Sequence, residues 1–402
     1  MIRPVRARCE RRIKRLLLWA CAGLLASCAP MVDHSGATSA PDASTQSAFT
    51  LRLIGERRLD HRLAFGGTVV GGLSGIDYDP ASDLYYLISD DRSVLSPTRF
   101  YTARLKIDEG GFSDAALQTV VTLLQPDGTP YPSFGSDAAA DAEAIRFDRL
   151  TQTLWWTSEG ERSIRKTRGQ YRLNDPFIRQ SSLAGRYIDE VPLDPMFRMT
   201  PEPLGPRDNR AFEGATLSLD AQSLWVAMEG PLIQDGRMPA SDHGAWSRFS
   251  RYDRTPAHGF GPLAIQLAYP IDPIPAERAL TLSHAVNGVS EILALDASRF
   301  LVLERAFALG AGWRIRLFEA DARLASDVKS IASLVERATE FTPMTKRLVL
   351  DFGSLAIHID NLEGLCFGPT LSNGHRTLVL VSDDNFNPGE VTQLLAFEIV
   401  PR

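Results

Sequence analysis

A pattern that recurs five times along this chain of 402 residues constrains its fold more than any other feature. In each copy a polar or acidic residue precedes a short apolar run, a turn follows, and a second apolar run ends in an acidic residue. The last copy, residues 361–387, reads NLEGLCFGPTLSNGHRTLVLVSDDNFN. The copies are spaced 69, 70, 77 and 73 residues apart when they are aligned on Gly75, Ala144, Gly214, Glu291 and Gly364. Such regular spacing indicates one repeated structural unit.

Each interval between copies holds about four strand-like runs, and in the first interval these are IDYD, LYYLIS, RFYTARLKI and ALQTVVTLL. Four short antiparallel strands per repeat are typical of a β-propeller blade. We therefore predict an all-β fold, a β-propeller of five four-stranded blades around a central channel. The alternative is a sixth blade within one of two longer intervals, residues 235–285 or 320–352.

The two ends of the repeat region indicate how the ring closes. The fifth copy supplies two strands and a third at residues 392–400, but no fourth strand follows. An unassigned alternating stretch, FTLRLIGERRL at Phe49–Leu59, precedes the first copy. Because pairing these two segments would remove the open sheet edges, we expect the N-terminal strand to complete the last blade.

The first 27 residues have the composition of a secretory signal peptide. Residues 3–15 are strongly basic, and the apolar run LLLWACAGLL at residues 16–25 is too short to span a bilayer. The Leu-Ala-Ser-Cys sequence that follows, ending at Cys28, resembles a bacterial lipobox. We predict that residues 1–27 are removed and that Cys28 is lipidated. Cleavage by an ordinary signal peptidase near an incidental cysteine is the alternative.

Residues 28–48 are small and polar, which predicts a flexible tether in front of the domain that begins at Phe49. Ala29, rather than an aspartate, follows Cys28, so the resemblance to a lipobox implies no retention in the inner membrane. We expect a bacterial outer-membrane lipoprotein that faces the periplasm, or a periplasmic or secreted protein if Cys28 is not lipidated.

The net charge restricts the partners of the mature chain. The first 27 residues carry seven of the 43 Lys and Arg residues and one of the 49 Asp and Glu residues, so the mature chain has a formal net charge of −12. This charge argues against nucleic acid as a partner, and it leaves the lipid anchor as the expected membrane contact. We expect a monomer. Cys366 is the one cysteine left after lipidation, and its apolar neighbours predict a buried, unreactive thiol.

The acidic residues of the repeat should meet at one opening of the channel. The first strand of each blade lines the channel and the second runs antiparallel to it, so the start of the first and the end of the second share a mouth. The starts are Ser74, Glu143, Glu213, Ser290 and Glu363, and the ends are Asp90 and Asp91, Glu159, Glu229, Glu304, and Asp383 and Asp384. Carboxylates at this density raise one another's pKa values unless guanidinium groups, backbone N–H groups or a hard cation such as Ca²⁺ compensates.

Two interpretations of these acids stay open. In one, they cap strands and tie neighbouring blades through hydrogen bonds. In the other, they form a site with Ca²⁺ as its cofactor, and nucleotide and organic cofactors are not expected because their motifs are absent from the sequence. The predicted residues of that site are the acids and bases Glu143, Glu213 and Glu363, the substrate-binding cations Arg92 and Arg305, and the metal ligands Asp90, Glu159, Glu229, Glu304, Asp383 and Asp384.

Short motifs in a fixed order resemble the bacterial phytase-like family, also described as "esterase-like activity of phytase". They are GGLSGIDY at residues 71–78, DAEAI at 141–145, FEGA at 212–215, GVSEI at 288–292, and NLEGL and SDDNF within 361–386. The resemblance covers roughly residues 50–400, so residues 49–402 are expected to be one phytase-like propeller domain. It implies a secreted or lipid-anchored hydrolase of phosphate or carboxyl esters, and it carries over no catalytic set.

Three functions therefore remain as hypotheses. The first is an envelope hydrolase that acts on a small phosphate or carboxyl ester through the carboxylate-rich mouth. The second is a non-catalytic outer-membrane lipoprotein that binds an envelope ligand or a protein partner at the same mouth. The third is a lactonase-like enzyme, a class that usually needs Asn ligands near the channel, and the candidates for these are Asn361, Asn385 and Asn387.

Overall fold

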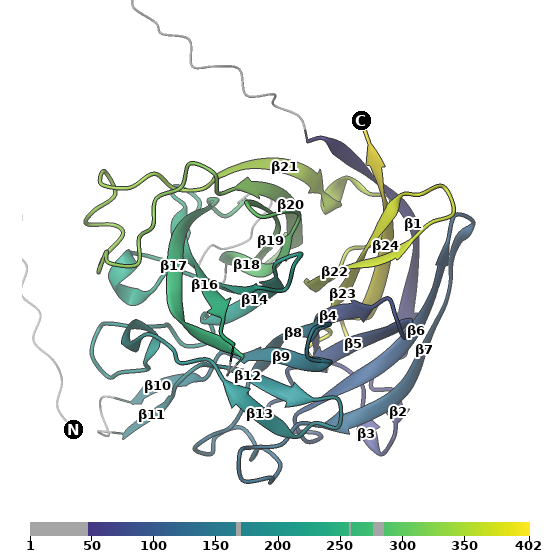
Figure 1. Cartoon of the computed structure of the whole chain (residues 1–402), viewed down its shortest axis with the longest axis horizontal. Coiled ribbons are helices and arrows are strands. Elements are labelled where there is room, and N and C mark those ends of the chain that lie inside the picture. Colours follow the sequence, from purple (N-terminus) through teal and green to yellow (C-terminus); the bar gives the residue numbers. More distant parts are fainter. Residues whose placement is uncertain (1–46, 166–169, 257–258, 276–284) are drawn as a thin grey trace, which may run out of the picture. The chain divides into compact units, whose positions relative to one another are not determined.

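The computed structural model describes residues 47–165, 170–256, 259–275 and 285–402. The predicted signal peptide, Cys28 and most of the predicted tether lie outside these residues. Within them, five four-stranded sheets follow one another around a channel (Figure 1). The predicted all-β, five-bladed propeller is confirmed. The described residues of the two intervals that were considered for a sixth blade belong to blades three and four and their loops.

In blades one to four the strands follow one another from the channel outwards, so strand order in each sheet repeats chain order. Blade one comprises β4 (Leu73–Asp79), β5 (Leu84–Ser89), β6 (Arg99–Asp108) and β7 (Gly111–Thr122), and blade two comprises β8 (Ala142–Asp148), β9 (Thr153–Ser158), β12 (Phe177–Ser182) and β13 (Tyr187–Glu190). Blade three comprises β14 (Phe212–Leu217), β15 (Ser223–Met228), β16 (Ala245–Arg254) and β17 (Phe260–Ile271), and blade four comprises β18 (Ala285–Ala294), β19 (Arg299–Ala308), β20 (Gly312–Asp321) and β21 (Thr345–Asp351).

Blade five is assembled from both ends of the described chain. Its strands are β22 (Leu362–Thr370), β23 (Arg376–Ser382), β24 (Thr392–Pro401) and, as the outermost, β1 (Phe49–Leu59). Strand β1 runs antiparallel to β24, from Phe49 opposite Pro401 to Leu59 opposite Thr392. The predicted closure by the N-terminal strand is therefore confirmed.

The remaining elements are short. Two hairpins extend from the blades: β2 (Ala64–Phe65) with β3 (Thr68–Val69), and β10 (Glu161–Arg165) with β11 (Gln170–Asn174). The described helices are three 3-10 helices at Pro195–Phe197, Ile233–Asp235 and Phe352–Ser354. None of the described residues forms a helix of the length and apolarity that a membrane span requires.

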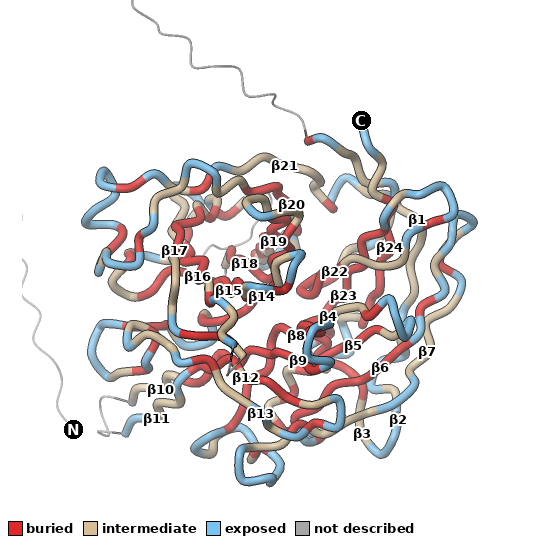
Figure 2. Tube along the Cα trace, in the orientation of Figure 1, coloured by how far each residue is buried: buried red, intermediate tan, exposed pale blue. Residues whose placement is uncertain are grey.

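The inner strands of the blades consist largely of buried residues (Figure 2). Clusters of buried apolar side chains fill the space between neighbouring blades. Alternation along strand β9 sends Trp155 into the cluster with blade three and Trp156 into the cluster with blade one. Cys366 on β22 lies in the cluster between blades five and one, where burial raises the pKa of its thiol. The predicted burial of this thiol is confirmed. These clusters hold the innermost strands in a fixed arrangement around the channel.

The innermost strands approach one another so closely that side chains are excluded at the aligned repeat positions. A Cβ atom at Gly75 would lie 2.5 Å from the carbonyl oxygen of Glu143, and one at Gly364 would lie 3.0 Å from the Ile76 nitrogen. Glycine is the residue that permits such contact between backbones. The same aligned position in blade four carries Glu291, whose carboxylate reaches into the channel.

Arg146 closes the channel at its centre. Its guanidinium group lies 2.5 Å from the Glu291 carboxylate. It also donates hydrogen bonds to one carbonyl group from the innermost strand of every blade, and the acceptors are Ile76, Ile145, Ala215, Ile292 and Leu365. Arg146 therefore lies between the two ends of the channel.

Candidate functional site

The starts of the innermost strands and the ends of the second strands meet at one mouth of the channel. Eight carboxylates from four blades gather there, and all but Asp90 are buried: Asp90, Asp141, Glu143, Glu159, Glu213, Glu229, Glu363 and Asp383. We call this set the acidic mouth. Three guanidinium groups, those of Arg92, Arg210 and Arg305, form ion pairs with its members. Carboxylates thus exceed their arginine partners by five.

Asp90, Asp141 and Glu143 form the first group within the acidic mouth, with oxygens that all lie within 4.8 Å of one another. Arg92 compensates this group in part, because its Nε donates to Asp141 Oδ1 at 2.7 Å. Burial raises the pKa of Asp141 to about 6, although Arg92 opposes the shift. Burial and neighbouring carboxylates raise the pKa values of Asp90 and Glu143 as well. One guanidinium therefore faces three acidic groups here.

Glu159, Glu213 and Glu229 form the second group, again with oxygens within 4.8 Å of one another. Glu229 accepts hydrogen bonds from Arg210 at 2.7 Å and from Arg305 at 3.0 Å. Glu159 is 1% exposed, and its Oε1 accepts from the Ala211 N–H at 2.6 Å. Its Oε2 is buried and has no hydrogen-bond partner among the described residues. Burial and the charge of Glu229 raise the pKa of Glu159.

Arg305 links the second group to blade five. Its Nη1 lies 2.8 Å from Glu363 and donates to Asn361 Oδ1 at 3.1 Å, and its Nη2 also lies 3.5 Å from Glu213. Although burial opposes the shift, the surrounding carboxylates raise the pKa of Arg305. With 11% of its side chain exposed, Arg305 is placed to hold these acids in position. The side chain of Arg92 is 29% exposed and is therefore more accessible to a ligand than that of Arg305.

Two further predicted ligands lie at the edge of the acidic mouth. Asp383 accepts a hydrogen bond from the Asn385 N–H at 2.7 Å, and burial and the charge of Asp90 raise its pKa. Asp384 accepts from the N–H groups of Gly72 and Phe386, so one of its oxygens is used by the backbone. Its second oxygen lies 3.5 Å from Nδ1 of His61.

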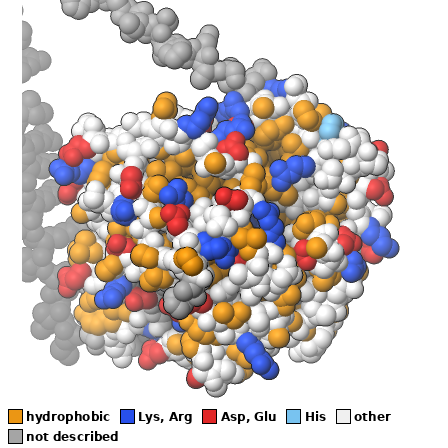
Figure 3. Space-filling model, viewed as in Figure 1, with side chains coloured by type: hydrophobic (Ala, Val, Ile, Leu, Met, Phe, Trp, Pro, Cys, Tyr) orange, Lys and Arg blue, Asp and Glu red, His pale blue; other side chains and the backbone are white. Residues whose placement is uncertain are grey.

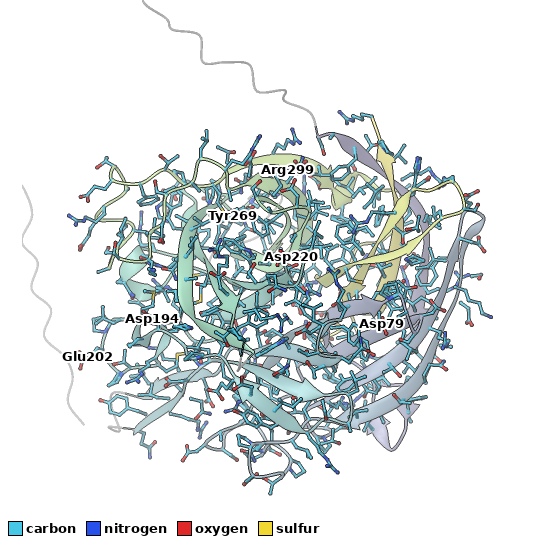
Figure 4. All side chains as sticks on the ribbon, in the orientation of Figure 1. Asp79, Asp194, Glu202, Asp220, Tyr269 and Arg299 are labelled. Atoms are coloured by element: carbon cyan, nitrogen blue, oxygen red, sulfur yellow. The ribbon has the colours of Figure 1, made fainter. Side chains whose placement is uncertain are left out.

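Glu304 lies apart from the acidic mouth. Its carboxylate accepts hydrogen bonds from Tyr269 at 2.9 Å, from Asn287 at 3.0 Å and from Lys346, between blades three and four. Tyr269 is labelled in Figure 4. The hairpin of β18 and β19 explains this position. Glu304 lies opposite Val289, as Met228 lies opposite Phe212 in blade three, so the position of Glu229 is taken by Arg305 in blade four. Arg305, rather than Glu304, therefore reaches the acidic mouth.

Three residues near this mouth were not singled out as site residues from the sequence. Asp141 lies two residues before Glu143, and this spacing places both on one face of an extended segment. That alternation was a usable signal. Arg210 and His61 lie in loops, where no periodicity marks them.

The donor set of the acidic mouth fits a hard cation. Every candidate ligand is a carboxylate oxygen, and oxygen is the donor that Ca²⁺ and Mg²⁺ prefer. Buried negative charge is unfavourable unless a cation or a proton neutralises it. This applies to the unpartnered Oε2 of Glu159 and to the excess of five carboxylates. The two buried groups could therefore bind a metal ion.

Charged side chains are not gathered by sign on the face seen in Figure 3, where Lys and Arg are interspersed with Asp and Glu. The grouping of acids at the acidic mouth comes from residues that are mostly buried. A ligand for this site would meet the carboxylates only after it had entered the mouth.

Solved structures with a similar fold include two gluconolactonases. The periplasmic gluconolactonase of Pseudomonas aeruginosa is 12% identical, with a TM-score of 0.35, over 88% of this chain and 99% of that chain. The gluconolactonase of Xanthomonas campestris is 9% identical, with a TM-score of 0.33, over 88% and 98%. The Dos1 propeller is 6% identical, with a TM-score of 0.33, over 81% and 67%. These values are too low to carry an argument about function.

No curated protein matches the sequence. One protein-family model does, and its description is "Phytase-like: Esterase-like activity of phytase". It matches residues 68–386, a range that begins before blade one and reaches the loop after β23 in blade five. Because this range is more than half of the sequence, the chain belongs to the phytase-like family.

Proposed function

We propose that the protein is an ester hydrolase whose acidic mouth holds a divalent hard cation, with Ca²⁺ as the first candidate. The observation that carries this proposal is the excess of carboxylates over guanidinium groups at the acidic mouth, which is largest in the group of Asp90, Asp141 and Glu143. The family description, which names an esterase-like activity, supports the reaction class. Phosphate esters and carboxyl esters are the two substrate classes to test.

Asp90, Asp141 and Glu143 are the residues we assign to the cation. This group has three carboxylates against the single guanidinium of Arg92, whereas the second group is paired with both Arg210 and Arg305. When bound, such an ion would polarise an ester oxygen and lower the pKa of a coordinated water. The first group therefore has the larger excess of negative charge, and an ion bound there could activate the ester and the water.

We assign the proton donor to the second group, Glu159, Glu213 and Glu229. Burial and the charge of Glu159 raise the pKa of Glu213, and burial and Glu229 raise that of Glu159, so protons are retained there at higher pH than on free carboxyl groups. Arg305 holds Glu213 and Glu363 in place, which makes it a positioning residue in this proposal. Arg92 is the cation that an incoming phosphate or carboxylate would meet.

Location in the cell is part of the proposal. Lipidation at Cys28 and a tether over residues 28–48 would place the propeller in the periplasm, attached to the outer membrane. The substrate would then be a small ester present in the cell envelope. Palmitate labelling of wild type and Cys28→Ala, followed by membrane fractionation, tests this placement, and equal labelling of both would reject it.

Turnover of a panel of phosphate and carboxyl esters, measured with Ca²⁺ and with a chelator, tests the reaction. We expect hydrolysis that needs the cation and that falls at least about 100-fold in Glu143→Gln. Glu340→Gln, at an exposed residue paired with Arg337, is the matched control and should keep full activity. Activity that is indifferent to chelation and to Glu143→Gln would reject the proposal. Ca²⁺ binding without turnover of any ester would favour the non-catalytic ligand-binding alternative.

A further inference from the structure

The opposite end of the channel is also a cavity, with a volume of about 620 Å³. All five blades line it, through the ends of their innermost strands and the turns that follow. The turns β4–β5 and β14–β15, which carry the labelled residues Asp79 and Asp220, help to locate it in Figure 4. Arg146 forms its floor and separates it from the acidic mouth. Its volume lies in the range of small-molecule sites.

Arg376 on β23 is a cation without an anion in this cavity. Its guanidinium lies 3.5 Å from the centre of the Phe367 ring, and among the described residues no carboxylate forms an ion pair with it. Desolvation lowers the pKa of Arg376. A cation that loses contact with water and gains no nearby anion shifts in this direction. Arg149 provides a second guanidinium, which donates to the Leu219 carbonyl.

The two carboxylates that line the cavity do not neutralise Arg376. Asp79 is buried, and its oxygens accept hydrogen bonds from the Ala81 N–H at 2.9 Å and the Ser82 hydroxyl at 2.5 Å. Asp77 accepts from the Phe147 N–H at 2.7 Å, and burial raises its pKa. Asp79 is thus held by its own turn and Asp77 by strand β8 of the neighbouring blade, and among the described residues neither forms an ion pair with Arg376.

The walls next to these cations are apolar. Leu150 is 52% exposed and Leu219 is 48% exposed, and both line the cavity with the ring of Phe367. An exposed leucine alone is ordinary. Two exposed leucines and an aromatic ring beside an unpaired guanidinium combine an apolar surface with a fixed polar contact, as small-molecule sites do.

We infer that this cavity is a second ligand site, for a small organic anion with a flat apolar body and one carboxylate, sulfonate or phosphate group. The anionic group pairs with Arg376, and Arg149 stands at the same rim to add a second contact. The apolar body lies against Leu150, Leu219 and Phe367. Because Arg146 closes the channel, binding here is independent of the acidic mouth and of any cation held there.

Binding of 8-anilinonaphthalene-1-sulfonate, an aromatic sulfonate whose fluorescence rises in apolar sites, tests this inference in the intact protein. We expect one site per chain. Arg376→Gln should weaken it at least tenfold, Leu219→Asp should abolish it, and 2-naphthoate should displace the dye. The uncharged N-phenyl-1-naphthylamine should bind at least tenfold more weakly, and Ca²⁺ should leave the titration unchanged.

Matched controls come from one loop outside the cavity. Leu324 is 82% exposed and neighbours Arg323, so Leu324→Asp and Arg323→Gln repeat the two substitutions elsewhere on the surface. Both should bind the dye as wild type does. Melting curves of all variants exclude dye uptake by loosened protein. Equal binding by wild type, Arg376→Gln and Leu219→Asp, or no saturable binding up to millimolar dye, would overturn the inference.

Discussion

The innermost strands β4, β8, β14, β18 and β22 run the length of the channel, and their two ends differ in chemistry. At their starts, eight carboxylates meet three guanidinium groups. At their other ends, two exposed leucines, Phe367 and Arg376 line one cavity, and no carboxylate partner is described for Arg376. The difference has its source in the repeat, because the acids at strand starts and second-strand ends face one opening. The aspartates that recur at the far-end turns, Asp79, Asp148, Asp220 and Asp296, instead each accept a hydrogen bond from the N–H group two residues later.

This contrast shows what repetition contributes to a propeller. Four of the five blades add acids to one opening, so a modest feature of each repeat becomes a high local charge. The opposite cavity depends on single residues such as Arg376, which no other blade duplicates. Arg146 lies between the two openings and pairs with Glu291.

Replacement of Arg146 by Met should give the largest effect. The substitution leaves the Glu291 carboxylate buried without its ion pair and five carbonyl groups without their donor. Breaking a buried pair by removal of one partner costs about 3–5 kcal/mol in the free energy of unfolding. Urea unfolding measures this loss. Arg146→Met with Glu291→Gln should recover part of it, and a loss below about 1 kcal/mol in the single variant would contradict the described role.

The pH dependence of stability without Ca²⁺ should be the next largest effect. Burial raises the pKa of Asp141 from 3.8 to about 6, so the folded state keeps this proton longer than the unfolded state does. Stability therefore falls as the pH rises from about 4 to 6, by up to about 3 kcal/mol for two pKa units. Asp141→Asn should flatten this part of the profile. Melting temperatures that are constant across this interval in wild type would contradict a buried, protonated Asp141.

Much of this architecture could be predicted because it depends on periodic features. The aligned glycines at 75, 214 and 364 mark the close approach of innermost strands, and the unpaired strand Phe49–Leu59 indicated the closure. The gathering of Glu143 and Glu213 followed from their place at strand starts. Their roles as acids and bases, and those of the proposed metal ligands, stay predictions.

Other features could not be predicted because they depend on the exact pairing register of two strands or on a single side chain. Glu304 was expected at the mouth, but the register of blade four places Arg305 at the position that Glu229 has in blade three. Arg146 lies in an apolar strand, and nothing in its neighbours indicates that its side chain turns into the channel. Arg210 and Arg376 have no equivalent in the other repeats, so aligning the copies does not identify them as site residues.

A smaller effect at Glu159 separates a cation site from a purely structural role of the acids. Glu159→Gln keeps an acceptor for the Ala211 N–H and removes a charge beside Glu229. In Ca²⁺-free buffer at pH 8 we expect about 1 kcal/mol of added stability, because like charges no longer oppose each other. The gain on adding Ca²⁺ should then be smaller than in wild type. If the acids only tie the blades together, the substitution should lower stability instead.

The smallest effect concerns the independence of the two cavities. Arg376→Gln removes a guanidinium with no described ion pair, so its unfolding free energy should change by less than about 0.5 kcal/mol. Its Ca²⁺ affinity, measured by calorimetry, should stay within twofold of wild type because Arg146 lies between the two ends. Arg92→Gln is the informative counterpart, since it removes a positive charge paired with Asp141 and should change Ca²⁺ affinity. If Arg376→Gln changed the Ca²⁺ affinity as much as Arg92→Gln does, Arg146 would not isolate the two ends of the channel.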